Sequence, residues 1–342
     1  MELDKRKQEI LCAVIGAYIE TGSPIGSKAL LERTGLSVSS ATVRNEMNEL
    51  EKLGYLRKPH TSAGRIPSDE GYRFYIATAL SDYRLNHDDL QRLSPPDLDF
   101  GNSDRLFDRV VQSLADFSGC TVFALSPVGR DGCYTFEVMP VGERNLVIMA
   151  IASDGTVNTQ FCRLPRPSSA EDCEKLSRIF NRVLSGFSAE MIGEVRLMLL
   201  EHEVILVLPD LQCVCAGVRE LVGRLSAYTL HIGGSTNLLT YPEFANIETA
   251  REYMRILDRH EQIVDALRKD FYQGNITIKI GCENLVFDSP YASMIEIVPG
   301  GNLPVMLGVM GPTRMHYSKI IAGCKHIISY MNSILEGRSG LL

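Results

Sequence analysis

The chain has 342 residues, of which 45% are hydrophobic and 23% charged, the composition of a globular protein with two or three domains rather than of a disordered or fibrous chain. Its 35 lysines and arginines against 42 aspartates and glutamates give a net charge of −7. A globally basic nucleic-acid coat protein is therefore excluded, and any contact with phosphate requires a local patch. The longest apolar run, residues 146–152, is too short to span a membrane.

The nine cysteines are odd in number, which disfavours a secreted disulfide framework. The uncharged stretch 10–19 follows three basic residues at 5–7, but acidic neighbours neutralise them and no cleavage site of the A-x-A type follows. We therefore expect a cytoplasmic protein with reduced thiols and no membrane association.

The positive charge is concentrated near the N-terminus. The first 80 residues carry 11 lysines and arginines against 10 acids, and the segment 52–66 contains four of these cations and no acid. Such a strip is typical of a surface that meets a phosphate backbone.

Three helices are predicted in this part of the chain. Apolar spacing places the first over 10–19 and the second over 27–33, and the third begins after Ser39 or Ser40 and ends at Gly54. Its predicted buried face consists of Val43, Met47 and Leu50, and that of the second helix of Ala29, Leu30 and Leu31. Two helices joined by a short, glycine-containing turn indicate a helix-turn-helix.

A strand, a loop and a second strand are predicted directly after the third helix. Residues 55–57 form the first strand, 59–64 a polar loop, and Ile66 begins the return, before a helix that starts at 67–70. This order predicts a wing beside a recognition helix.

The remaining 262 residues predict an acidic α+β body. Residues 81–102 read as a polar linker, and no fixed-period repeat follows. The predicted helices are 103–118, 170–184, 212–225, 247–272 and 316–335, and the predicted strands are 121–126, 135–141, 145–152, 156–163, 204–208, 276–280, 294–298 and 304–310.

The third helix and the wing supply the candidate site. Their residue types suit DNA, because asparagine can pair with adenine, arginine with guanine, and alanine or the threonine methyl group with the thymine methyl. The candidate DNA-binding residues are Ser40, Ala41, Thr42, Arg44, Asn45, Asn48, Lys52, Arg57, Lys58, His60 and Arg65. The alternative for the helix alone is a solvated amphipathic face; the wing and the basic strip favour DNA.

The other motifs do not indicate a phosphate-binding loop, a zinc site or a catalytic site. The segment 22–28 lacks the spacing of a phosphate-binding loop, and Cys213 and Cys215 form C-x-C rather than a zinc-type pair. No nucleophile elbow or kinase motif is present. We predict no catalytic residue, no cofactor and no metal, and we expect Arg314 to pair with a neighbouring carboxylate rather than to bind an anion.

Two segments carry a family resemblance. SSATVRNEMNELEKLGYL at 39–56 and PHTSAGRIPSDEGYRFY at 59–75 resemble the heat-inducible transcription repressor HrcA family of bacteria, and GPTRMHY at 311–317 is similar to it as well. The resemblance implies a winged helix-turn-helix, a GAF-like α+β domain and a dimerisation domain inserted into the latter. It also implies a homodimer on an inverted-repeat operator called CIRCE in front of chaperone genes, and dependence on the GroE chaperonin.

The implied domains are, in chain order, the winged helix at 1–80, the linker at 81–102, the two parts of the GAF-like domain at 103–164 and 246–342, and the inserted domain at 165–245. The leading hypothesis is a sequence-specific repressor that acts as a dimer. One alternative is a one-component regulator in which the GAF-like domain binds a small effector. Another is an enzyme with a DNA-targeting head, which would need a cluster of titratable groups that the sequence does not display.

Overall fold

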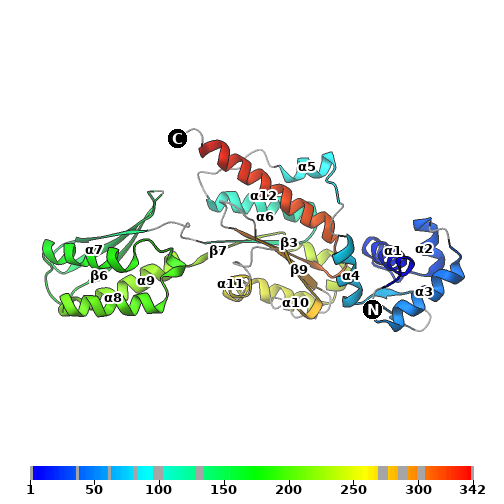
Figure 1. The fold of residues 1–342 in the computed structure, drawn as a ribbon, viewed down its shortest axis with the longest axis horizontal. Helices are drawn as coiled ribbons and strands as arrows, with labels where there is room; N and C mark the ends of the chain where they lie inside the picture. The colour runs from blue at the N-terminus through cyan, green and yellow to red at the C-terminus, as the bar shows by residue number, and fades with distance from the viewer. Residues whose placement is uncertain are drawn as a thin grey trace. The chain divides into compact units, whose positions relative to one another are not determined.

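The computed structural model describes residues 3–35, 38–60, 63–79, 83–94, 103–127, 134–153, 155–268, 276–283, 292–298 and 305–339. They form two compact units, one made of Met1–Leu125 and Leu230–Leu342 and the other of Ser126–Thr229. Both units combine helices with β-sheet (Figure 1), and the predicted α+β class is confirmed.

The first unit begins with three helices that share one core: α1 (Lys5–Thr21), α2 (Ser27–Thr34) and α3 (Ser40–Lys52). The predicted buried face of α3 is confirmed, with Val43, Met47 and Leu50 all buried. In α2 only Leu30 is fully buried, whereas the predicted Ala29 is exposed, because an eight-residue helix presents one side to its neighbours.

A small antiparallel ribbon follows α3. It pairs β1 (Leu56–Arg57) with β2 (Ile66–Pro67). Ile25, two residues before α2, extends this ribbon: the Ile25 amide donates to the Arg65 carbonyl at 2.9 Å, and the Arg65 amide donates to the Ile25 carbonyl at 2.8 Å. We call β1, β2 and the loop between them the wing; the loop is described except for residues 61–62.

Helix α4 (Asp69–Ala79) leads from the wing toward the body. The Gly71 amide donates to the Ser68 hydroxyl at 3.1 Å at its first turn, as expected of a serine N-cap. A short helix α5 (His87–Leu93) then occupies part of the predicted linker, which is thereby corrected. Its Asn86 and Asp89 form a reciprocal capping box, which stabilises a helix turn within a polar segment.

The body of the first unit is a five-stranded sheet in the order β7-β3-β10-β9-β8. Helices α6 and α12 cover one face and α10 and α11 the other (Figure 1). Strands β9 and β10 are buried at every position, as this cover requires. The strands are β3 (Thr121–Pro127), β7 (Tyr228–Gly233), β8 (Ile276–Ile280), β9 (Ala292–Ile297) and β10 (Met306–Pro312), and the helices are α6 (Ser103–Ser118), α10 (Ile247–Leu257), α11 (His260–Arg268) and α12 (Tyr317–Ser339).

The second unit is an antiparallel three-stranded sheet in the order β4-β5-β6 with three helices. Helix α7 packs on β4, α9 packs on β6, and α8 packs against both helices. The strands are β4 (Thr135–Pro140), β5 (Asn145–Ile151) and β6 (Val157–Arg163), and the helices are α7 (Ala170–Leu184), α8 (Glu194–Val207) and α9 (Val214–Leu225).

Short 3-10 turns connect these elements. They are η1 (Ala189–Met191), η2 (Pro209–Leu211), η3 (Asn237–Thr240), η4 (Pro242–Phe244) and η5 (Gly281–Glu283).

Two predicted elements are wrong. The apolar segment 204–208, predicted as a strand, lies largely in α8, because a short apolar run does not separate a strand from a helix with apolar residues on two faces. The helix predicted over 247–272 is two helices, since α10 ends at Leu257 and α11 begins at His260; the end of that prediction, 269–272, lies outside the described residues.

The limits of the second unit differ from those expected for the inserted domain. The compact unit covers Ser126–Thr229, whereas the order of elements suggested 165–245. The four consecutive strand predictions divide between two sheets, because β3 joins the five-stranded sheet and β4 to β6 form their own. After the second unit, strand β7 returns the chain to the five-stranded sheet, where it pairs with β3. The sequence analysis did not predict this strand.

In the described part of the chain, no helix is both long enough and apolar enough to cross a membrane. The seven cysteines whose side chains are described are all free thiols.

The contact between the wing and Ile25 gives a prediction for stability. A Cβ on Gly64 would lie 2.5 Å from the Ile25 carbonyl carbon and oxygen, so Gly64→Ala should destabilise the protein by about 1–3 kcal/mol. Gly16→Ala is the matched control, because a Cβ there meets nothing within 4 Å inside α1 and alanine favours a helix. Urea unfolding of the full chain should show a lower midpoint for Gly64→Ala only; equal midpoints would contradict the close approach.

Candidate nucleic-acid interface

Helix α3 is held firmly at its start. The Thr42 amide donates to the Ser39 hydroxyl at 3.1 Å, so Ser39 rather than Ser40 is the N-cap. The Ser40 hydroxyl instead lies 3.1 Å from the Ser27 hydroxyl at the beginning of α2. These contacts fix the angle between the two helices of the helix-turn-helix.

Lys7 of α1 secures the middle of α3. Its ammonium lies 2.8 Å from Asp4, 3.1 Å from Glu49 and 3.2 Å from Glu46. The hydrogen bonds to these three carboxylates raise the pKa of Lys7 above its usual value, with Asp4 contributing most. Glu46 and Glu49 of α3 are therefore paired with a cation of α1.

Most of the predicted residues of α3 lie at the surface. Ala41, Arg44, Asn45 and Lys52 are exposed, and Ser40, Thr42 and Asn48 are half-buried. Within the described residues, Arg44, Asn45 and Lys52 make no side-chain hydrogen bond or ion pair, so their polar groups are available to a ligand. The predicted exposed face of the helix thus exists.

The wing carries three further exposed residues of the predicted set: Arg57, Lys58 and His60. Lys58 lies 3.8 Å from Glu51 at the end of α3, an exposed pair that contributes little to stability.

Arg65 is placed differently from the other predicted residues. It is buried, with 8% of its surface exposed. Its guanidinium donates to the Asn48 carbonyl oxygen at 2.5 Å and lies 2.8 Å from Glu51, while its Nε has no hydrogen-bond partner within the described structure. Arg65 therefore joins the wing to α3 and does not lie free at the surface.

This contact also orients Asn48. Because a guanidinium has only donors, the side-chain oxygen of Asn48 must face Arg65 and its NH₂ group must point away. Asn48 can then donate a hydrogen bond to a ligand through its NH₂ group, while one lone pair of its oxygen is already occupied by Arg65.

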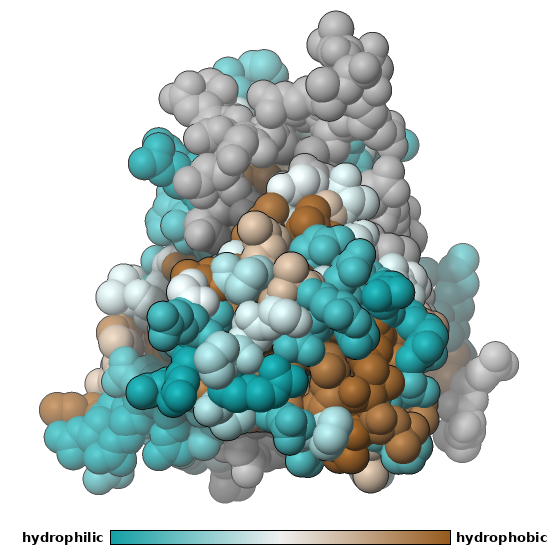
Figure 2. Space-filling model, turned by 90° about the vertical axis from the view of Figure 1, so that its left-hand side faces the viewer, coloured by the Kyte–Doolittle hydropathy of each residue, from teal (hydrophilic) through white to brown (hydrophobic). Residues whose placement is uncertain are grey.

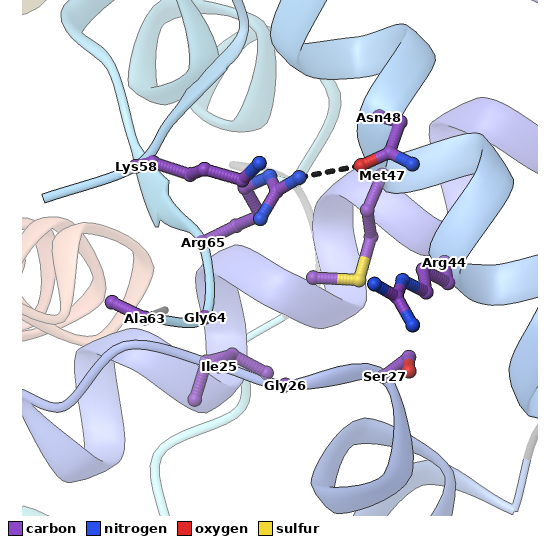
Figure 3. Close-up of a pocket in the computed structure, with 10 residues that line it drawn as sticks. All are labelled: Ile25, Gly26, Ser27, Arg44, Met47, Asn48, Lys58, Ala63, Gly64 and Arg65. Atoms are coloured by element: carbon purple, nitrogen blue, oxygen red, sulfur yellow. Dashed lines mark hydrogen bonds between the residues drawn. The ribbon is translucent and has the colours of Figure 1, made fainter. Parts of the chain in front are cut away.

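A pocket of about 390 Å³ lies between α3, the wing and the start of α2. Figure 3 shows Arg44, Lys58 and Arg65 reaching toward it from different elements. The lining consists of Ile25, Gly26, Ser27, Arg44, Met47, Asn48, Lys58, Ala63, Gly64 and Arg65, with three cations and no carboxylate.

Sequence reasoning missed the part played by the segment before α2. Gly26 and Ser27 line the pocket, although residues 22–28 are not a phosphate-binding loop. What brings this segment to the pocket is the pairing of Ile25 with Arg65 of the wing. The two residues are 40 positions apart, so no local pattern in the sequence indicates it. Lys7 was also missed, because nothing in its spacing indicates three acidic partners.

Arg314 follows the expectation of a carboxylate partner. Its guanidinium donates to Glu243, with one contact of 3.2 Å, and lies over the ring of Tyr241. The described residues contain no group of three or more histidines, cysteines, aspartates or glutamates placed to hold a metal ion.

Comparisons of the sequence with known proteins identify transcription repressors as its relatives. The family model described as "HrcA protein C terminal domain" matches residues 104–321. A "Heat-inducible transcription repressor HrcA" of Acetivibrio thermocellus is 32% identical over 98% of this chain and 97% of its own length. One of the same name from Carboxydothermus hydrogenoformans is 32% identical over 98% and 99%.

Among solved structures, a crystal structure of a hypothetical protein is 21% identical, covers 97% of this chain and 98% of its own, and has a TM-score of 0.60. It supports the fold alone.

The protein is thus a transcription regulator and not an enzyme. The chain belongs to the HrcA family of heat-inducible transcription repressors.

The buried position of Arg65 gives a testable difference from its exposed neighbour. Arg65→Met should destabilise the protein by about 1–3 kcal/mol, because the Asn48 oxygen and Glu51 lose a buried donor. Arg57→Met should change stability by no more than about 0.5 kcal/mol, since Arg57 is exposed. Urea unfolding monitored by circular dichroism measures both; equal effects would refute the structural role of Arg65.

Proposed function

We propose that the protein represses transcription by binding a DNA operator through a winged helix-turn-helix, with α3 in the major groove and the wing along the backbone. One observation carries the proposal: α3 presents Arg44, Asn45 and Lys52 at its surface without ion-pair partners among the described residues, and Arg44 lines one pocket with Lys58 and Arg65 of the wing. A helix fits the width of the major groove, and these side chains suit base edges and phosphates.

The proposed roles follow from exposure and chemistry. Arg44 and Asn45 read base edges, and Ala41 and the Thr42 methyl group contact thymine methyls. Asn48 donates to a single acceptor, because its oxygen is bound to Arg65. Ser40, Lys52, Arg57, Lys58 and His60 contact the backbone or the minor groove. Arg65 holds Asn48 through its terminal guanidinium nitrogen, and its buried Nε has no partner among the described residues and is available to a DNA phosphate.

Direct readout by α3 can be tested by substitution. Arg44→Ala or Asn45→Ala should weaken operator binding by about 1–3 kcal/mol and leave the affinity for random DNA nearly unchanged. Arg33→Ala is the control, because Arg33 pairs with Glu20 on α2 and outside the proposed interface. Titrations of both DNAs at fixed salt measure the effect; equal losses on operator and random DNA would exclude base readout.

The operator is proposed to be the inverted repeat CIRCE in front of chaperone genes, bound by a homodimer. A twofold axis that relates two DNA-binding domains matches an inverted repeat.

The second unit provides a surface for the dimer. Helix α8 buries Leu197, Leu200 and Val204 on one side, and Figure 2 shows apolar side chains gathered at the lower right of the view. The exposed apolar residues of α8 are Val195, Met198, Leu199, Ile205, Leu206 and Val207.

This apolar stripe is unusual for a surface helix. Val195 and Leu206 are 73% and 67% exposed, and monomers rarely leave contiguous apolar patches of this kind uncovered. We assign the dimerisation role of the family's inserted domain to this unit, with α8 at the interface. The first unit then contributes the GAF-like domain around the five-stranded sheet.

A charge on α8 should disrupt the dimer. Leu206→Lys is expected to convert the protein to monomers at micromolar concentration in sedimentation, because the lysine would be desolvated at the interface. Ile247→Lys is the matched control, since Ile247 is 73% exposed, close to the 67% of Leu206, but lies on α10. A variant on the open sheet face, Phe161→Lys (66% exposed), should remain dimeric; dissociation by Phe161→Lys alone would place the interface on the sheet.

Heat control is proposed to act on folding in the cytoplasm, through dependence on the GroE chaperonin. The connectivity of the first unit supports this. Strand β3 pairs with β10, so Phe123 lies opposite Gly308 across more than 180 residues, and the whole second unit intervenes. Such long-range pairing slows folding and prolongs exposure of apolar surface.

Refolding tests the chaperonin step. Denatured protein diluted into buffer should recover operator binding slowly, and chaperonin with ATP should raise the yield, most at heat-shock temperature. Chaperonin without ATP is the control. Full spontaneous recovery at growth and heat-shock temperatures, with no gain from chaperonin, would remove this mechanism and favour control by a small ligand of the body.

A further inference from the structure

We infer that the pocket between α3, the wing and the start of α2 is a phosphate site that seats one phosphodiester group of each operator half-site. The inference rests on the proposed DNA binding and deepens it, because it assigns a defined binding cavity rather than a general basic surface. It joins residues from three segments of the chain: Gly26 and Ser27 before and in α2, Arg44 and Asn48 on α3, and Lys58 and Arg65 on the wing.

The donors around the pocket are well suited to a phosphate. Arg44 and Lys58 are exposed cations at its edge, and the buried Arg65 supplies a guanidinium from within. The Nε of Arg65 is buried and has no partner among the described residues. A buried donor without a partner is costly unless a ligand or solvent satisfies it.

The start of α2 adds backbone donors. Its N-cap is Gly26, which provides no side-chain hydrogen bond to the first turn. The free amides and the helix dipole of an uncapped N-terminus attract anions. Helix α2 has eight residues, and its start lines the same pocket as Arg65 through Gly26 and Ser27.

The balance of charge favours an anion. Three cations line the pocket, and Glu51 is the carboxylate that pairs with two of them, at 2.8 Å from Arg65 and 3.8 Å from Lys58. A net positive charge remains. The volume of about 390 Å³ holds a phosphate group with several waters, since one water occupies roughly 30 Å³.

The position identifies the source of the phosphate. The pocket lies between the helix proposed for the major groove and the wing, where the sugar-phosphate backbone separates the two grooves. A phosphodiester of bound DNA would therefore reach it, and it would set the depth and register of α3, as backbone contacts do.

Methylphosphonate substitution tests this directly. The probe is a duplex carrying the inverted repeat, or a repeat selected in vitro by the full-length protein, with single backbone phosphates replaced by neutral methylphosphonates. For the wild type, one symmetric position per half-site should reduce affinity about tenfold, the effect of one lost charged hydrogen bond. Lys58→Met should reduce that penalty to about twofold at this position only.

Lys28→Met is the matched control, because Lys28 is an exposed cation of α2 that does not line the pocket; it should retain the full penalty. Variants that keep the wild-type penalty at every phosphate would overturn the assignment to DNA. Arg65 itself is not substituted here, since its loss is expected to destabilise the wing.

A second measurement separates the sources of phosphate and is independent of the operator. Nuclear magnetic resonance of ¹⁵N-arginine-labelled full-length protein should show a shift of the Arg65 Nε–H signal with short duplex DNA, and a weaker one with inorganic phosphate at equal ionic strength. Shifts with inorganic phosphate but not with DNA would make the pocket a free-anion site and overturn the inference. No shift with either probe would exclude a phosphate site altogether, whereas failure of the proposed function would appear as absence of any DNA binding.

Discussion

The DNA-binding surface depends on the interaction of Arg65 with α3. One residue makes three connections: its backbone pairs with Ile25 before α2, and its guanidinium binds Asn48 and Glu51 on α3. Without its guanidinium, the end of the wing loop would lose a hydrogen bond to Asn48 and an ion pair to Glu51 of α3. The position of the wing, the orientation of Asn48 and the shape of the pocket all follow from this contact.

The charge at the surface of α3 depends on which cations its three glutamates bind. The chain is acidic overall and α3 itself contains Glu46, Glu49 and Glu51. Lys7 binds the first two and Arg65 the third, so each carboxylate of α3 has a cationic partner within the domain. The exposed side of α3 is positive because these acids are neutralised within the domain, and a patch of this kind can meet phosphate despite the net charge of −7.

Local sequence patterns predicted most of the N-terminal elements, because each depends on neighbours in the chain. The apolar face of α3 repeats at helical intervals, and the Ser39 cap is a short-range hydrogen bond. The strand pairing of the remaining chain could not be predicted in this way. Strand β3 was recognised as a strand, but its neighbours in the sheet are β7 and β10 rather than β4, and periodicity carries no information on pairing. The exposed stripe of α8 misled for a related reason, since apolar residues on two faces hide the helical period.

In the candidate site too, local features could be predicted from the sequence and tertiary contacts could not. Exposure of Arg44, Asn45 and Lys52 could be predicted from the helical wheel, whereas burial of Arg65 depends on Asn48 and Glu51, 17 and 14 positions earlier in the chain. A basic residue in a glycine-containing loop is ordinarily exposed, and only the tertiary contact makes it a structural residue.

The most direct test of this account is a double-mutant cycle between Arg65 and Asn48. The free energy of unfolding would be measured in urea for the wild type, Arg65→Met, Asn48→Ala and the double variant. A charged hydrogen bond joining the wing to α3 predicts a coupling free energy of at least about 1 kcal/mol. Single effects that add to within about 0.3 kcal/mol would show that the two side chains are independent, and the central role of Arg65 would be wrong.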